Sequence, residues 1–268
     1  MSMEPFVLDE TEDFAVIYKP PRMHSVYKSI REQLRQGAGD TLFDWYLQRS
    51  FRPAEVFPPV KGFSGGKEGD TFQRTGGGLL HRLDYETQGL MLFAKNQQSL
   101  DHLLRQQDKG KFIKEYNAIC QKADVPSSFP PPPFSVLNDD LPQTPFFIES
   151  FFRPFGPGRK QVRPVLGPLQ SVKAKRNRKT ASDQGRFYRT EITGIFETEV
   201  PGRYSVTARI YRGFRHQIRC HLAWIGCPVL NDPLYGQEGQ SADGFLALRA
   251  IGLSFTGPDG KQHEYRLN

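Results

Sequence analysis

The sequence predicts an α+β fold with a mixed, largely antiparallel central sheet flanked by helices and loops. Apolar runs of strand length outnumber segments with helical spacing, and short turns often separate them. The 268 residues include 25 glycines and 21 prolines, which is typical of a protein with many turns. No internal repeat is visible, and we expect one domain over residues 1–268 with an insertion at about 126–186.

Two strands and a helix are predicted near the N-terminus. Residues 6–18 hold two short apolar segments around an acidic turn, which favours a strand, a turn and a second strand ended by Lys19-Pro20-Pro21. Residues 41–49 have apolar side chains at helical spacing behind a cap at Asp40 or Thr41. Residues 52–78 are rich in proline and glycine and are expected to form a loop.

The middle of the chain predicts a strand, a helix and a strand before the insertion. Residues 89–94 form a compact apolar run, most simply a buried strand, and residues 97–107 carry leucines at helical spacing. Residues 111–120 are predicted to be another strand. The insertion then begins with the stiff proline-rich stretch 126–133 and continues as a Pro-, Gly- and basic-rich segment.

The C-terminal third returns to regular structure. Residues 187–195 and 203–211 alternate in the manner of paired strands. Residues 216–224 have one apolar helical face. Residues 246–255 predict a final long strand, followed by a turn and a closing strand near Tyr265.

Composition restricts the compartment and the partners. The formal net charge is +7 with a pI near 9.3, which favours a polyanion such as nucleic acid or an anionic membrane surface. No run approaches 18 apolar residues, and the first residues lack the features of an export signal. Three cysteines without a CxxC pair, Cys120, Cys220 and Cys227, argue against a disulfide framework or a structural zinc site. We therefore expect a cytoplasmic protein.

Three short motifs have a simpler interpretation than catalysis. The GxSxG at residues 62–66 lacks the strand and helix that a nucleophile elbow requires. Residues 76–78 are three glycines without the rest of a phosphate-binding loop, so a turn is expected. His216 and His221 lie five residues apart and do not share a helix face, and no cluster at metal-ligand spacing accompanies them.

Two segments place charged side chains in apolar surroundings. Asp84 stands directly before the run 89–94, where a carboxylate is costly to bury without a partner; the alternative is an ordinary turn residue, which composition alone favours. Arg219 lies beside the apolar face of its predicted helix and could pair with a carboxylate; the alternative is a surface arginine. These residues by themselves identify no reaction.

Five segments, in order along the chain, resemble the RluA family of RNA pseudouridine synthases. Residues 13–20 resemble the family's opening strand and Lys-Pro turn, and residues 80–90, LHRLDYETQGL, resemble its H-R-L-D-x-x-T-S-G-L signature. Residues 114–118 resemble its K-x-Y-x-A strand. Residues 213–222 resemble its G-R-x-H-Q-I-R-x-H-L block, and residues 232–236 its D-x-x-Y-G block. Gln88 stands where the family usually has Ser, and Phe214 where it often has Arg.

The resemblance implies isomerisation of uridine to pseudouridine in RNA, with one essential aspartate and no cofactor or metal. By position Asp84 is then the catalytic residue, acting either through a covalent adduct or by removing a sugar proton. Arg219 would pair with Asp84 and keep it ionised. Tyr116 would pack on the uracil and could handle the C5 proton. Arg82 would help to flip or hold the nucleotide, because a stacked uridine cannot reach the carboxylate.

The resemblance also implies further substrate contacts and a partner. Leu83 and Ile218 are expected as apolar walls, and His81, His216 and Gln217 as positioning groups. The catalytic signal begins near residue 6, so we expect a form without the N-terminal S4 module of many family members, acting as a monomer on ribosomal or transfer RNA. RNA contact is then expected from basic residues of the insertion, Lys173, Lys175 and Arg176, whose alternative is a solvated loop.

Two other functions are alternatives to the synthase. A non-catalytic RNA-binding module on a degenerate synthase fold predicts loss of Asp84, Tyr116 or Arg219, and all three are present. A hydrolase would need a second carboxylate beside Asp84. Glu86 is the nearest one, with no evident division into acid and base.

Overall fold

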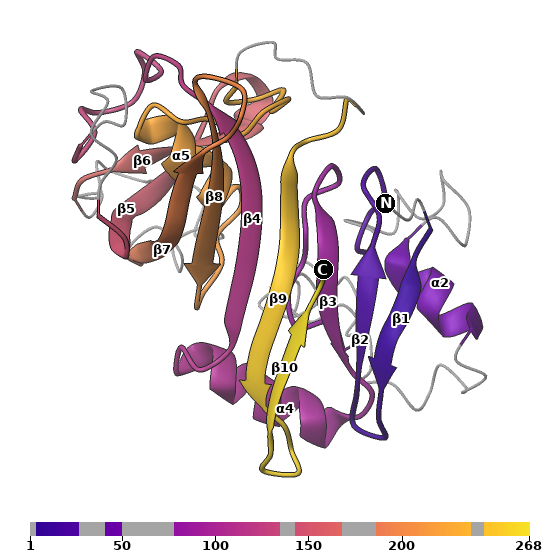
Figure 1. The fold of residues 1–268 in the computed structure, drawn as a ribbon. Coiled ribbons are helices and arrows are strands. Elements are labelled where there is room, and N and C mark those ends of the chain that lie inside the picture. Colours follow the sequence, from indigo (N-terminus) through magenta and orange to yellow (C-terminus); the bar gives the residue numbers. More distant parts are fainter. Residues whose placement is uncertain (1–3, 27–40, 50–77, 135–142, 168–185, 237–243) are drawn as a thin grey trace. The chain divides into compact units, whose positions relative to one another are not determined.

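A computed structural model describes residues 4–26, 41–49, 78–134, 143–167, 186–236 and 244–268. The chain forms two compact units (Figure 1). The first comprises residues 1–114 and 249–268, and the second comprises residues 115–248.

The first unit contains a mixed sheet in the order β1-β2-β3-β9, with β10 paired to β9. Its strands are β1 (Phe6–Glu10), β2 (Phe14–Lys19), β3 (Gln88–Ala94), β9 (Leu248–Thr256) and β10 (Gln262–Arg266). The β1–β2, β2–β3 and β9–β10 pairs are antiparallel, whereas β3 and β9 are parallel. All residues of β2 and β3 are buried, as expected for central strands.

Two helices accompany this sheet. α2 (Leu42–Arg49) is preceded by Thr41, whose hydroxyl caps the helix by accepting a hydrogen bond from the Asp44 backbone N–H at 3.2 Å. α4 (Gln97–Asp108) is capped by Asn96, which accepts from the Ser99 backbone N–H at 2.8 Å. α4 packs against β3, and its leucines join the apolar core of this unit.

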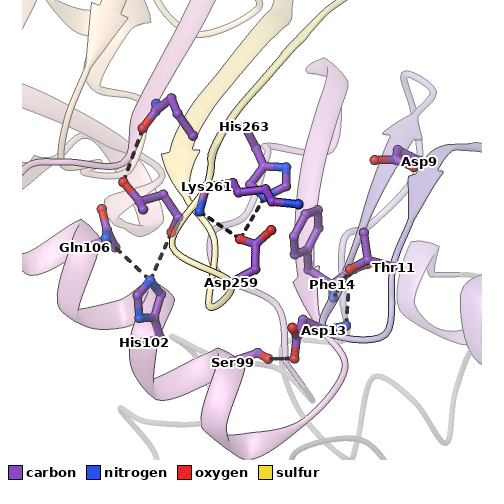
Figure 2. Close-up of polar contacts among 12 residues, drawn as sticks. Asp9, Thr11, Asp13, Phe14, Ser99, His102, Gln106, Asp259, Lys261 and His263 are labelled. Carbon is purple, nitrogen blue, oxygen red and sulfur yellow. Dashed lines mark hydrogen bonds and ion pairs between the residues drawn. The ribbon is translucent and has the colours of Figure 1, made fainter.

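Polar contacts fix the turns at one end of the first unit, as Figure 2 shows. Asp13 accepts a hydrogen bond of 2.7 Å from the Ser99 hydroxyl, which ties the β1–β2 turn to α4. Asp259 accepts from the Lys261 backbone N–H at 3.1 Å within the β9–β10 turn. These hydrogen bonds fix the conformation of the two turns at this end of the unit.

One glycine is required where β3 and β9 meet. Gly89 has φ +126°, and a Cβ there would lie 2.2 Å from the Ala250 carbonyl oxygen. Any other residue would push the two strands apart. The start of β3, directly after the Asp84 segment, is therefore fixed by backbone contact.

The second unit contains a sheet in the order β4-β8-β7-β5-β6. Its strands are β4 (Ile113–Gln121), β5 (Phe146–Phe155), β6 (Gln161–Val165), β7 (Tyr188–Glu197) and β8 (Arg203–Ile210). The β5–β6, β5–β7 and β7–β8 pairs are antiparallel. α5 (Gln217–Trp224) is buried along its whole length and packs against β6 and β7.

The predicted α+β class is confirmed, and the expected helices and strands lie within a few residues of their predicted bounds. The insertion at about 126–186 additionally holds β5, a short 3₁₀ turn (Pro157–Arg159) and β6, which the sequence analysis did not predict. β6 contains Pro164, and proline disfavours a strand because it has no N–H to donate to the neighbouring strand. β6 accommodates the proline because it lies at the edge of the sheet. The GxSxG motif and the basic cluster at 173–179 lie outside the described residues.

Candidate active site

The segment that contains Asp84 forms a turn directly before β3 in the first unit. Leu80 and Leu83 are buried on its N-terminal side. The backbone N–H of Thr87 donates to the Asp84 carbonyl oxygen at 3.1 Å. The turn leaves the Asp84 side chain half-buried ahead of a fully buried strand. A carboxylate there is partly desolvated and still open to a ligand.

Two side chains, one at the end of β2 and one in the segment that follows it, hold the backbone on either side of Asp84. The Ser25 hydroxyl donates to the Leu83 carbonyl oxygen at 3.0 Å and accepts from the Leu83 backbone N–H at 3.2 Å. The Lys19 ammonium donates to the Tyr85 carbonyl oxygen at 3.3 Å. Because the residues before and after it are both held, the Asp84 carboxylate has a restricted range of positions.

Lys19 is a buried cation in the neighbourhood of two carboxylates. Its side chain is fully buried and also donates to the carbonyl oxygens of Pro20 at 2.9 Å and Met23 at 2.8 Å. Burial lowers the pKa of Lys19 to about 7, and the charges of Asp84 and Glu86 act in the opposite direction. The carbonyl acceptors further favour the ammonium form.

A second cation lies within electrostatic range of Asp84. The carboxylate interacts with the Arg82 guanidinium as well as with Lys19. Glu86, on the same turn, forms an ion pair of 3.6 Å with Arg22. Asp84 therefore stands in a neighbourhood that contains two basic side chains.

Two buried polar atoms of the same segment have no hydrogen-bond partner among the described residues. They are Nδ1 of His81 and the hydroxyl oxygen of Thr87. The other ring nitrogen of His81 lies 3.4 Å from the Leu90 carbonyl oxygen, and burial lowers the pKa of His81 to about 3, so the ring is neutral. Unpaired buried polar groups are rare in folded proteins and call for a functional or hydration partner.

Arg219 and Asp232 form a bidentate ion pair in the second unit. Nε of Arg219 donates to one carboxylate oxygen of Asp232 and Nη2 to the other, each at 2.7 Å. The side chains are 4% and 0% exposed. One of these oxygens also accepts from the backbone N–H groups of Leu234 at 2.9 Å and Tyr235 at 3.2 Å. The buried carboxylate is therefore well satisfied, and it locks one edge of the guanidinium.

Tyr235 adds a second constraint on the same guanidinium. Arg219 lies over the Tyr235 ring at 5.5 Å. The Tyr235 hydroxyl accepts from the Val162 backbone N–H at 2.7 Å and lies 3.1 Å from Nδ1 of His216. Burial raises the pKa of Tyr235, so its hydroxyl stays protonated. Tyr235 thus links Arg219, β6 and the start of α5.

The start of α5 depends on Gln217. His216 precedes the helix with φ +54° and makes no side-chain cap. The Gln217 side chain accepts from the Phe214 backbone N–H at 3.0 Å and donates to the Thr190 hydroxyl at 3.1 Å. The glutamine therefore ties the chain before the helix to its first residue and anchors the helix to β7.

The proposed site residues are divided between the two units. His81, Arg82, Leu83 and Asp84 belong to the first unit, where they form one segment. Tyr116, His216, Gln217, Ile218 and Arg219 belong to the second. Tyr116 is 6% exposed on β4, and Ile218 is buried on α5. Lys173, Lys175 and Arg176 lie outside the described residues. Pairing of Arg219 with Asp84 stays a prediction.

Sequence reasoning missed the supporting residues. Asp232 and Tyr235 stand in the D-x-x-Y-G block but were assigned no role, although their place in that block was a usable signal. Ser25 had no signal, because its partner Leu83 is 58 residues away in the chain.

The described residues hold no group of three or more potential metal ligands. Cys120, Cys220 and Cys227 are free and buried. Burial raises the pKa of Cys120 and Cys220 well above the usual value, so these thiols are poor nucleophiles. None of the described helices is long and apolar enough to span a membrane.

Residues 13–224 match the model of a protein family described as RNA pseudouridylate synthase. An uncharacterized RNA pseudouridine synthase of Helicobacter pylori strain J99 is 25% identical over 98% of this chain and 65% of its own length. Ribosomal large subunit pseudouridine synthase D of Buchnera aphidicola subsp. Schizaphis graminum is 28% identical over 66% of this chain and 45% of its own length. The chain thus spans less than two thirds of these relatives.

A solved structure shares the fold. Human RNA Pseudouridylate Synthase Domain Containing 1 superposes with a TM-score of 0.60 at 16% identity, covering 99% of this chain and 84% of the other. The blocks noted between residues 13 and 222 lie within the matched range, whereas the block at residues 232–236 lies beyond it.

Proposed function

Because the chain belongs to the RNA pseudouridylate synthase family, we propose that it isomerises specific uridines in structured RNA to pseudouridine. In this reaction the C1′–N1 glycosidic bond breaks, the uracil turns, and a C1′–C5 bond forms. The proton on C5 is lost and N1 gains one, so the product is an isomer of the substrate and no redox or group-transfer cofactor is consumed.

Asp84 is the catalytic residue in this proposal. The observation that supports it most is a half-buried carboxylate on a turn held from both sides by Lys19 and Ser25. Such a carboxylate could attack the sugar or base, or remove a sugar proton to give a glycal. Lys19 and Arg82 place basic side chains near this carboxylate.

Other residues have roles by their match to the family's motifs. Arg219 would pair with Asp84 through the donors outside its fork with Asp232, and Tyr116 would pack on the uracil. Arg82 and His81 would hold the flipped nucleotide, since a base stacked in RNA is beyond reach of the carboxylate. His216, Gln217, Ile218 and Leu83 would shape and position the site.

The finer assignments belong to the same proposal. The substrate would be ribosomal or transfer RNA, and the protein would act as a monomer in the cytoplasm. Residues 1–268 would work as one catalytic domain carrying the 126–186 insertion. The relative named ribosomal large subunit pseudouridine synthase D supports ribosomal RNA as the first substrate to test.

Mapping of pseudouridine in total RNA tests the function. Cells with and without the gene are compared position by position, and we expect one or a few sites to disappear from ribosomal or transfer RNA when the gene is deleted. A plasmid copy should restore them. Identical maps in the two strains would contradict the proposal and favour the non-catalytic RNA-binding module.

A further inference from the structure

One face of the second unit's sheet combines aromatic and basic side chains. Successive residues of β5 alternate between buried side chains, such as Ile148 and Phe152, and more exposed ones on the opposite face. We call the latter, with their neighbours on β6 and before β7, the aromatic–arginine face. It consists of Phe147, Phe151, Arg153, Phe155, Arg163 and Phe187.

Side-chain contacts hold these aromatic rings in place. The rings of Phe151 and Phe187 are 5.3 Å apart in an edge-on arrangement. The Arg163 guanidinium lies 5.3 Å over the Phe155 ring. Phe147 and Phe187 are nevertheless 44% and 49% exposed. Exposed aromatic rings gain free energy when a partner removes their apolar surface from water.

The charge on this face is uncompensated near β6. Arg153 and Arg163 are directly opposite each other in the β5–β6 ladder, an arrangement of like charges that destabilises a sheet. Residues 150–167 contain four basic side chains and no acidic one. Among the described residues, the Arg153 guanidinium makes no hydrogen bond or ion pair. An anion between the two arginines would remove the repulsion.

The acidic side chains on the same face are already engaged. Glu149 forms an ion pair with Arg189, whose guanidinium also lies 4.7 Å over the Phe147 ring. Glu191 accepts a hydrogen bond of 2.6 Å from the Tyr211 hydroxyl. The net character of the face is therefore aromatic and positive.

We propose that the aromatic–arginine face binds a strand of RNA outside the uridine-modifying site. Phe147 and Phe187 would stack with bases, and Arg153 and Arg163 would hold a phosphate. Aromatic rings and arginines on a sheet face are the recurring solution for single-stranded RNA. The opposed arginines favour a polyanion over a protein surface. The inference rests on the proposed function for RNA as the partner.

The test is RNA binding by a Phe147→Ser, Phe187→Ser double variant. Anisotropy of a fluorescent single-stranded RNA should show affinity reduced by about tenfold or more, since each lost stack weakens binding by roughly five- to a hundredfold. The salt dependence should keep its slope, because no phosphate contact is removed. Arg153→Gln should instead reduce the slope of log K against log salt by about 1.

Phe196→Ser is the matched control. Phe196 is 68% exposed on the same strand as Arg189, beside Glu197 and outside the aromatic–arginine face. The Phe196→Ser variant should bind RNA with the affinity of the wild type. Near-native circular dichroism and thermal unfolding of each variant exclude misfolding as the cause.

Two outcomes separate this inference from the proposed function. Unchanged RNA affinity in the folded double variant would overturn the inference and leave the face to a protein partner. A wild-type protein that binds RNA through this face without forming pseudouridine would contradict the proposed function alone.

Discussion

Arg219 depends on a partner that lies thirteen residues away in the chain. The fork with Asp232 uses two of its nitrogens, and the Tyr235 ring lies against its face. A long flexible side chain is thereby reduced to one orientation before any substrate binds. We interpret Asp232 as a positioning residue, because it would act on the proposed reaction through Arg219.

Asp232→Asn tests this interpretation. The substitution removes the carboxylate charge that forks with the buried Arg219 guanidinium, and we expect the free energy of unfolding to fall by about 3–5 kcal/mol. If the variant still folds, kcat for pseudouridine formation should fall more than KM rises, because orientation at the reacting atoms is lost. Urea unfolding and steady-state kinetics measure the two effects.

Asp259→Asn is a suitable comparison, because Asp259 is an exposed aspartate in the β9–β10 turn. It should leave kcat unchanged. Wild-type kcat in a folded Asp232→Asn protein would show that Asp232 has no role in positioning.

α5 is held by polar contacts that are entirely buried. Nε2 of His221 lies 3.0 Å from the Ser150 hydroxyl and Nδ1 lies 2.8 Å from the Thr190 hydroxyl. All three side chains are at most 1% exposed. Two hydroxyls can satisfy a neutral imidazole, since each can donate or accept. The described part of the chain gives this ring no carboxylate partner that would stabilise an imidazolium. The helix is thus built around a histidine that must stay neutral.

The stability of the protein should therefore fall at acidic pH. Burial lowers the pKa of His221 to about 3, against about 6.5 in the unfolded chain. Below pH 6.5 the unfolded state binds a proton that the folded state does not, so stability is complete above pH 6.5 and is lost progressively toward pH 3. The expected slope is about 1.4 kcal/mol per pH unit for this residue.

Chemical unfolding of the wild type and of His221→Gln between pH 5 and pH 8 measures this slope, in a range where most carboxylates stay ionised. The variant should be less stable at pH 8 and have a shallower dependence on pH. His81, also neutral, should account for part of the slope that remains. Parallel pH curves for the two proteins would rule out the role assigned to His221.

At the scale of the molecule, periodicity was enough to predict the class of the fold and most of its elements. The buried runs of β2 and β3 and the leucines of α4 carry strong patterns. β6 was missed because its short sequence contains Pro164, which is acceptable only at a sheet edge. Whether a strand lies at an edge depends on the assembled sheet.

For the candidate site, the sequence predicted the motif residues but not the residues that support them. Asp84 and Arg219 stand in motifs with enough fixed positions to be found in one sequence. The residues that support the Asp84 segment could not be predicted. Ser25 and Lys19 reach that segment only once β2 and β3 pair in register. Contacts of this kind follow from tertiary structure and leave no local pattern.

The net charge of +7 acquires a more definite meaning from these positions. Some cations have proposed roles at the reacting group, as Lys19, Arg82 and Arg219 do. Arg153 and Arg163 lie on the proposed RNA-binding face. Both groups suit a polyanionic substrate, one for chemistry and one for affinity.

The central claim is that Asp84 carries the reaction, and pseudouridine formation by purified Asp84→Asn protein tests it most directly. The substrate is an RNA with the uridine identified by mapping, and nucleosides are separated by chromatography after digestion. We expect turnover to fall by roughly 10²–10⁴-fold or more, with thermal unfolding and RNA affinity close to those of the wild type. Wild-type turnover by the folded variant would contradict the claim.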